Sequence, residues 1–117
     1  MDTTELSRRV EAAYAERALL SQPLYRQAVA EVLDLLDRGV LRTAEPKDGK
    51  WVTYPWIGRA ILLYFGMRKM EVQEVGPFEY HDKIPLKRNL AAAKVRVVPP
   101  GTVRYGAHLE AGVVLMP

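Results

Sequence analysis

The sequence predicts an α+β fold, in which a small helical N-terminal domain with a β-hairpin leads into the first coil of a parallel β-helix. Apolar residues recur three or four positions apart in three segments before residue 68, as they do in amphipathic helices. An Asp-Gly pair between two short segments indicates a hairpin. From Val97 onward the apolar residues recur every six positions, and such hexapeptide repeats are typical of a parallel β-helix.

The first two helices are expected over residues 4–18 and between Pro23 and Gly39. Asp2 and Glu5 stand in a capping-box-like relation at the start of the first helix. Pro23 suits the first turn of the second helix, and Gly39 provides its stop. The stripe of the second helix that we expect to be buried consists of Tyr25, Ala28, Val29, Val32, Leu35 and Leu36.

A hairpin and a third helix come next. Residues 41–45 and 51–54 flank a stretch that contains Asp48-Gly49, so we expect them to pair. Pro55 opens the third helix, in which Gly58 and Gly66 lower the helix propensity, so burial must be its main support. Its expected apolar face consists of Trp56, Ile57, Ala60, Ile61, Leu63, Tyr64 and Met67.

The helical periodicity is lost between residues 71 and 90, which predicts an extended connection with short strands near 78–80 and at Leu86. A helical turn is expected around 89–93, and a strand over 94–98. The hexads place four aliphatic residues at one phase, where they would point into a triangular coil: Val97, Val103, Leu109 and Leu115. Residues 97–114 make three hexads, which is one turn of such a coil.

Two domains are therefore expected, a helical one over residues 1–94 and the start of a β-helix over residues 95–117. About three or more repeat units are needed for a stable stack. We accordingly expect the chain to be the N-terminal portion of a longer protein.

The composition is that of a soluble globular protein, with 49% hydrophobic and 26% charged residues. The chain has no cysteine, which excludes disulfides, thiolate metal sites and a cysteine nucleophile within it. Its net charge of +3 is too small to indicate nucleic-acid binding. No stretch has the length of a membrane span and no signal pattern is visible, so a cytoplasmic location is the default expectation.

Three blocks of sequence identify a family by their order and spacing. They are residues 48–56 with 60–65, residues 80–87, and an Arg-Val-Val-Pro-Pro motif within 95–100 that is followed by 103–107 and 114–117. The chain resembles the tetrahydrodipicolinate N-succinyltransferases, enzymes of the succinylase branch of lysine and diaminopimelate biosynthesis. The resemblance covers almost the whole chain.

The resemblance implies a homotrimer with a left-handed β-helix and with succinyl-CoA as co-substrate in a groove between subunits. The amino group of a small dicarboxylate would attack the thioester carbonyl, assisted by an acidic general base from a later coil. We therefore expect no catalytic residue, no metal and no bound cofactor within these 117 residues. Neither nucleic acid nor a membrane is expected as a partner.

Arg96 is the candidate substrate-binding residue, because the family's arginine before Val-Val-Pro-Pro contacts the dicarboxylate. A guanidinium matches a carboxylate with two parallel hydrogen bonds. The alternative for Arg96 is a surface arginine at a strand edge. Arg104 is a possible substrate or subunit-interface residue, and Asp82 with Lys83 is expected to form an ion pair in the connector. Neither His81 nor His108 is expected to be catalytic.

Aromatic residues around the hairpin and third helix are expected to pack in the core or between domains: Trp51, Tyr54, Trp56, Tyr64 and Phe65. A winged-helix-like DNA-binding module is the alternative function, with Arg42, Lys47 and Lys50 as phosphate contacts. Against it, the second helix carries acidic residues where a recognition helix needs positive charge. A stand-alone binding or assembly domain without catalysis is a further alternative.

Overall fold

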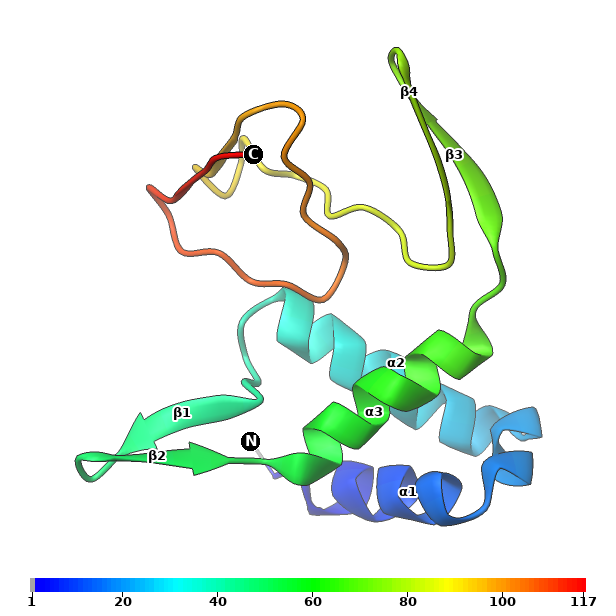
Figure 1. Cartoon of the computed structure of the whole chain (residues 1–117). Coiled ribbons are helices and arrows are strands. Elements are labelled where there is room, and N and C mark those ends of the chain that lie inside the picture. The colour runs from blue at the N-terminus through cyan, green and yellow to red at the C-terminus, as the bar shows by residue number, and fades with distance from the viewer. Residues whose placement is uncertain (1) are drawn as a thin grey trace.

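The computed structural model describes residues 2–117 and confirms the α+β class. The three helices and the hairpin before the third helix form one half of the molecule, the helical half (Figure 1). The hairpin after the third helix and the C-terminal segment form the other, the β half. The helices are α1 (Thr4–Ala15), α2 (Pro23–Asp37) and α3 (Pro55–Met67), with a 3₁₀ helix, η1, at Arg17–Ser21. The strands pair as β1 (Ala44–Lys47) with β2 (Lys50–Thr53), β3 (Glu71–Val75) with β4 (Phe78–Asp82), and β5 (Arg96–Val97) with β6 (Val114–Leu115).

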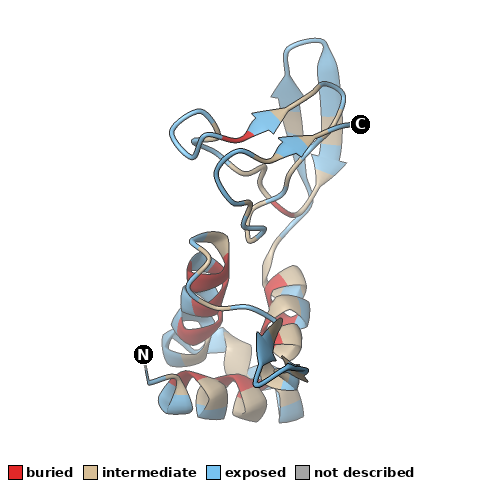
Figure 2. Cartoon of the chain, turned by 90° about the vertical axis from the view of Figure 1, so that its left-hand side faces the viewer, coloured by how far each residue is buried: buried red, intermediate tan, exposed pale blue. Residues whose placement is uncertain are grey.

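The core lies between the three helices, where Figure 2 shows the buried residues concentrated. Of the predicted stripe on α2, all members are buried except Tyr25, which is half-buried, and Leu33 is buried in addition. On α3 the buried residues are Ile57, Ala60, Leu63 and Tyr64, while the other members of the predicted face are half-buried. No helix of residues 2–117 is long and apolar enough to cross a membrane.

Helix α2 ends as the sequence predicts. The Gly39 backbone N–H donates to the Leu36 carbonyl at 3.0 Å, and the Val40 N–H donates to the Leu35 carbonyl at 2.9 Å. These two bonds form a Schellman motif, which requires a left-handed residue after the helix, and Gly39 supplies it with φ of 76°.

Helix α1 begins at Thr4 as predicted, but its N-terminal capping and its end differ from the prediction. The Asp2 carboxylate accepts a hydrogen bond from the Thr4 backbone N–H at 2.9 Å, but Glu5 pairs with Arg8 and Arg9 and does not complete a capping box. The helix ends at Ala15, and the chain continues as η1 where a single helix to residue 18 was expected.

The β1–β2 hairpin is confirmed, with its first strand shifted. Asp48 and Gly49 both have positive φ, at 52° and 76°, and form a two-residue turn of type I′. A two-residue turn brings both strands up to Asp48-Gly49, so the first strand occupies 44–47 and the prediction of 41–45 was wrong. Pro46 fits this strand opposite Trp51 because a hairpin of two strands has free edges.

The segment after α3 is a second hairpin, and the prediction of an extended connection was wrong there. Strands β3 and β4 pair antiparallel, with Val75 opposite Phe78. Gly76 has φ of 57° and precedes Pro77, an arrangement that suits a type II′ turn with glycine at its first central position. The short strand expected near 78–80 lies within β4, and Leu86 forms an isolated antiparallel bridge with Arg104.

The C-terminal segment contains one parallel strand pair. Arg96 lies opposite Val114 and Val97 opposite Leu115, so each residue pairs with the one three hexads further along the chain. The expected strand over 94–98 is limited to Arg96 and Val97, and ahead of its start Lys94 has φ of 59°, which is outside the extended region. The four aliphatic residues at the predicted inward phase are all half-buried. No stacked β-helix is present within residues 2–117.

Candidate functional site

Arg96 lies on β5 with its side chain exposed, between the buried Val95 and the half-buried Val97. Its backbone N–H donates to the Val113 carbonyl at 3.0 Å, which fixes the strand against β6. Within residues 2–117 the Arg96 guanidinium has no side-chain hydrogen bond and no ion pair. The exposed guanidinium therefore keeps its N–H donors available for an anionic group.

Arg104 is held by partners within the chain. Its Nη2 donates to Asp82 Oδ2 at 2.6 Å, and its guanidinium lies 5.7 Å from the centre of the Phe65 ring. The structure therefore gives Arg104 a role in joining the C-terminal segment to β4 and α3. Its side chain is still half exposed, and its contact with a substrate or another subunit stays a prediction.

Asp82 accepts hydrogen bonds that favour its charged form. The pKa of this carboxyl is lowered, chiefly by the Lys83 backbone N–H, and further by the Ile84 backbone N–H and by the positive charge of Arg104. The expected ion pair with the Lys83 side chain was wrong. Lys83 Nζ instead donates to the Phe65 carbonyl at 3.3 Å, near the end of α3.

A buried ionic contact lies at the end of α2, and the sequence analysis missed it. Lys87 Nζ donates to Asp37 Oδ1 at 2.7 Å and to the Asp37 carbonyl at 2.9 Å. The same Oδ1 accepts the Gly106 backbone N–H at 2.9 Å. Only 8% of the Lys87 side chain is exposed, and its ammonium already has two acceptors on Asp37. The sequence around Lys87, which is followed by Arg88 and Asn89, carries no signal of this contact.

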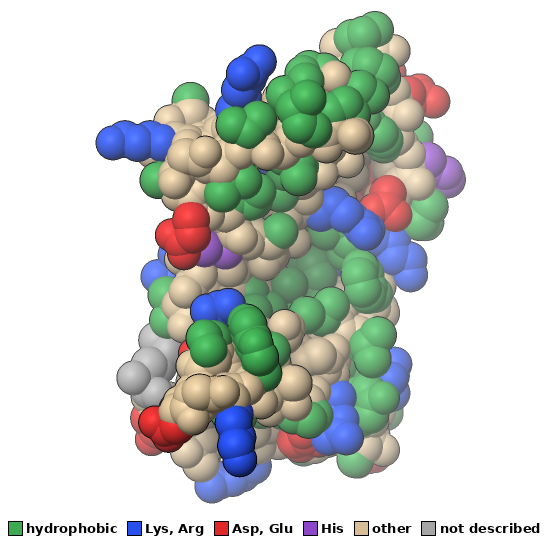
Figure 3. Space-filling view, turned by 60° about the vertical axis from the view of Figure 1, so that its left-hand side comes forward, with side chains coloured by type: hydrophobic (Ala, Val, Ile, Leu, Met, Phe, Trp, Pro, Cys, Tyr) green, Lys and Arg blue, Asp and Glu red, His purple; other side chains and the backbone are tan. Residues whose placement is uncertain are grey.

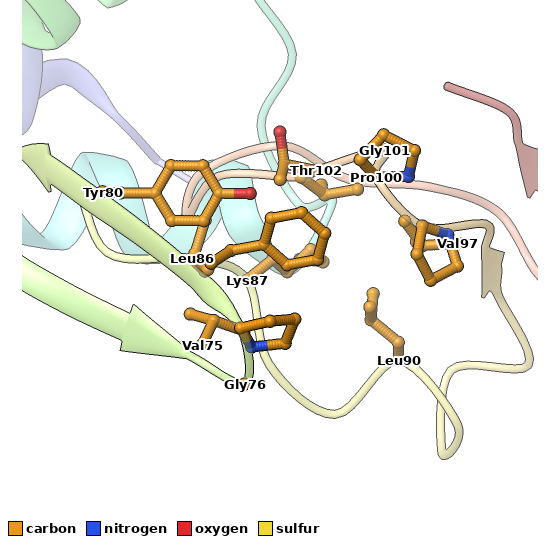
Figure 4. Close-up of a pocket in the computed structure, with 14 residues that line it drawn as sticks. Val75, Gly76, Tyr80, Leu86, Lys87, Leu90, Val97, Pro100, Gly101 and Thr102 are labelled. Atoms are coloured by element: carbon orange, nitrogen blue, oxygen red, sulfur yellow. The ribbon is translucent and has the colours of Figure 1, made fainter.

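An apolar cavity of about 300 Å³ lies between the β3–β4 hairpin and the turn that follows β5 (Figure 4). Val75, Tyr80 and Leu86 line one side, and Val97 and Pro100 line the other. A dicarboxylate needs charged or N–H donors for its oxygen atoms, and this lining is mainly apolar. The cavity is therefore a poor site for such a substrate.

Two other cavities have linings that are more polar than that of the first. One, of about 540 Å³, lies between the end of α2 and residues 106–110, and it includes Arg42, His108 and Glu110. The other, of about 530 Å³, lies at the base of the β3–β4 hairpin, where Arg68 and Arg88 face acidic residues of β3. Among residues 2–117 no group of three or more His, Cys, Asp or Glu side chains is placed to hold a metal ion.

The two histidines lie apart from Arg96. His81 is exposed on β4, opposite Val72. His108 lies against Gly39, and its Nε2 is 3.6 Å from Glu110 Oε1. Neither arrangement includes a nucleophile that the imidazole could activate.

The expected aromatic packing is confirmed for most of the group. Trp56, Tyr64 and Phe65 pack in or against the core, and Tyr54 donates its hydroxyl to Glu45 Oε1 at 2.5 Å. Trp51 is the exception, with 68% of its surface exposed on the β1–β2 hairpin.

Comparison with known proteins identifies the same family as the sequence blocks. The family model described as tetrahydrodipicolinate N-succinyltransferase N-terminal matches residues 5–67, which include all three helices but the first residue of α1. Proteins of Yersinia pestis (strain Pestoides F) and Yersinia pseudotuberculosis (serotype O:3, strain YPIII) are each 39% identical to the chain over 123 residues. Both are named 2,3,4,5-tetrahydropyridine-2,6-dicarboxylate N-succinyltransferase.

These alignments cover 97% of the chain and 45% of each relative, so the chain spans a little under half the length of the curated relatives it matches. The family match includes the helical core and the β1–β2 hairpin, and the relatives extend the similarity beyond α3, through β3–β4 and β5. The chain thus belongs to the tetrahydrodipicolinate N-succinyltransferase N-terminal family.

Proposed function

We propose that the chain is the N-terminal portion of an acyltransferase that transfers succinyl from succinyl-CoA to tetrahydrodipicolinate in lysine and diaminopimelate biosynthesis. The observation that carries the proposal is the 39% identity over 97% of the chain to relatives that are named for this transfer. The DNA-binding alternative gains no support from the described residues or from the comparisons.

The C-terminal segment is proposed to be the first coil of a left-handed β-helix, with the domain boundary at residues 94 and 95. The parallel pairing of residues three hexads apart supports this proposal, because three hexads make one turn of a triangular coil. The half-buried aliphatic residues at the inward phase support it too. Further coils would then cover them from the open end.

Exposed apolar side chains on the β half support further contacts of this part of the molecule. Figure 3 shows apolar side chains gathered on the half opposite the helices, and the exposed residues of the β half include Val75, Phe78, Val114 and Met116. Large exposed apolar areas usually mark interaction sites. We assign these contacts to further coils and to the other subunits of a homotrimer in the cytoplasm.

Arg96 is proposed to bind a carboxylate of the acceptor substrate. Its unpaired, exposed guanidinium on a short, hydrogen-bonded strand supports this role. The chain would contribute no catalytic residue, metal or cofactor. Succinyl-CoA and the acidic general base would lie on later coils, and the helical half would help to close the substrate end of the site. Catalysis would rest on holding the amine and the thioester together.

The test uses the protein expressed from its complete gene. Release of CoA from succinyl-CoA is followed with a thiol reagent, with and without tetrahydrodipicolinate. Acceptor-dependent release is the expected result. Its absence in a folded protein would contradict the proposal.

Variants of two exposed arginines test the role of Arg96. The substitution Arg96→Ala removes up to two charged hydrogen bonds to the acceptor, so KM for tetrahydrodipicolinate should rise by about 10- to 100-fold while KM for succinyl-CoA stays constant. Arg8→Ala, at an exposed site on α1, is the matched control and should leave both constants unchanged. Equal kinetics of the two variants would remove Arg96 from the substrate site.

A further inference from the structure

The helical half and the β half of the molecule are joined covalently only by residues 68–70, between α3 and β3. Side-chain contacts join them as well, among them Lys83 with the Phe65 carbonyl and Arg104 with the Phe65 ring, and one carboxylate accepts two hydrogen bonds across the boundary. Asp37, the last residue of α2, accepts one hydrogen bond from the Lys87 ammonium at 2.7 Å and one from the Gly106 backbone at 2.9 Å. Its two donors come from different segments of the β half, so this carboxylate fixes both segments to the end of one helix.

The two segments that Asp37 holds are also hydrogen-bonded to each other. The Lys87 N–H donates to the Val103 carbonyl and the Tyr105 N–H donates to the Pro85 carbonyl, both at 2.8 Å. These bonds flank the bridge between Leu86 and Arg104. Asp37 therefore holds a small antiparallel unit that includes Arg104, and the orientation of this unit follows from the direction of α2.

Burial and the helix end favour this contact. The side chain of Lys87 is 8% exposed and that of Asp37 is 21% exposed, so water competes little for their hydrogen bonds. Lys87 Nζ also donates to the Asp37 carbonyl, one of the unpaired carbonyls at the negative end of the α2 dipole. Loss of the carboxylate would leave a nearly buried ammonium without its counter-ion, and such a cation tends to move toward solvent.

The two halves pack closely at this boundary. A Cβ atom on Gly106 would lie 3.1 Å from Leu33 Cδ1, and one on Gly39 would lie 2.6 Å from the His108 ring. Beside these contacts, the Tyr64 and Tyr105 rings lie 6.3 Å apart. Small shifts at this boundary would therefore produce overlap, and the ionic contact selects the orientation in which overlap is avoided.

We infer that Asp37 is a positioning residue, which fixes the orientation of the helical half relative to the β half and through it the placement of Arg96, the proposed substrate-binding residue, relative to the helices. The part that concerns substrate rests on the proposed function, in which the helical half closes the substrate end of the site. Asp37 does not touch the substrate in this role.

The absence of cysteine makes the orientation directly measurable in the protein from its complete gene, provided any cysteine outside residues 1–117 is first replaced. Cysteines introduced at the exposed positions Glu31 on α2 and Glu79 on β4 receive spin labels, and the distance between them is measured by pulsed electron paramagnetic resonance. Labelled subunits are mixed with an excess of unlabelled protein, so that distances between the subunits of the proposed homotrimer do not contribute. The wild type should then give one narrow distance distribution. Asp37→Asn should broaden or shift it, and a distribution equal to that of the wild type would overturn the inference.

Two further variants separate orientation from loss of folding. Asp37→Asn with Lys87→Met removes the unpaired ammonium, so this protein should fold, and it should still give the broadened distribution. Glu11→Gln is the matched control, because Glu11 pairs with Arg59 at 2.8 Å inside the helical half and has no contact across the boundary. A broadening in Glu11→Gln equal to that in the Asp37 variants would also overturn the inference.

Kinetics test the substrate part. In both Asp37 variants KM for tetrahydrodipicolinate should rise at least 10-fold, and KM for succinyl-CoA should change less than 2-fold. An altered distance with an unchanged acceptor KM would overturn the positioning role. If the wild type releases no CoA, the proposed function fails, and the distance measurements still decide whether Asp37 orients the two halves.

Discussion

Replacement of Gly39 by alanine should destabilise the protein by about 2–5 kcal/mol, and two separate causes contribute. Gly39 has φ of 76°, and a residue with a Cβ atom costs about 1–2 kcal/mol in the left-handed region. The added Cβ would also lie 2.6–2.7 Å from three atoms of the His108 ring, and overpacking of this kind costs about 1–3 kcal/mol. Typical stabilities are about 5–15 kcal/mol, so the change is large.

The two causes can be separated by urea unfolding followed by circular dichroism. Adding His108→Ala to Gly39→Ala removes the ring, so the double variant should regain about 1–3 kcal/mol relative to Gly39→Ala. The strain of the left-handed backbone should remain. The matched control is Gly58→Ala, because Gly58 is inside α3 with no atom within 4 Å of the added Cβ. This change should stabilise the protein by about 0.5–1 kcal/mol.

Two results would refute the reasoning on Gly39. A Gly39→Ala protein within about 0.5 kcal/mol of the wild type would show that neither the backbone nor the ring limits this position. If the loss occurs but is the same with and without His108, the close approach of the ring is not a cause, and the left-handed conformation alone accounts for it.

Two further predictions concern the core and the pH dependence. Leu63→Ala should lower the free energy of unfolding, measured in urea, by about 2–5 kcal/mol because Leu63 is fully buried. Leu62→Ala, at a position that is 51% exposed, should lower it much less, and equal losses would contradict the placement of α3. The hydrogen bond to Glu45, with smaller contributions from burial and the Glu45 charge, raises the pKa of the Tyr54 phenol. Its stabilisation should thus be complete below about pH 10 and lost as the pH rises through the raised pKa. Absorbance titration should show one tyrosine shifting down in Glu45→Gln, and identical titrations of the two proteins would exclude the contact.

The parts of the fold that follow from local sequence were predictable. Helix α2 has a proline in its first turn, apolar residues at helical spacing and Gly39 after its end, so its bounds follow from the sequence alone. The turn at Asp48-Gly49 is equally local. The β3–β4 hairpin was missed because Gly76-Pro77 also fits a simple break in the chain, and the apolar residues of β3 do not alternate regularly.

Contacts between distant residues could not be predicted in the same way. Asp37 and Lys87 are 50 positions apart, and no pattern in either segment indicates that they meet. The partner of Asp82 was misassigned for the same reason, because its sequence neighbour Lys83 was the simplest choice and Arg104 is distant. The proposed role of Arg96 concerns a substrate, which no pattern in the sequence displays, and the structure adds that this side chain is exposed.

The interval of three hexads between the paired residues of β5 and β6 has a consequence for how the protein is assembled. The pairing of β5 with β6 closes a loop that is shorter than the one closed by the contact of Asp37 with Lys87. The entropy lost on closing a loop grows with the logarithm of its length, so the strand pairing loses less. If later coils repeat the interval, each new strand forms on the one before it at the same sequence separation. The contact order then stays low however many turns are added. The helical half and β5 would serve as the template on which the remaining chain is laid down turn by turn, in the direction of synthesis.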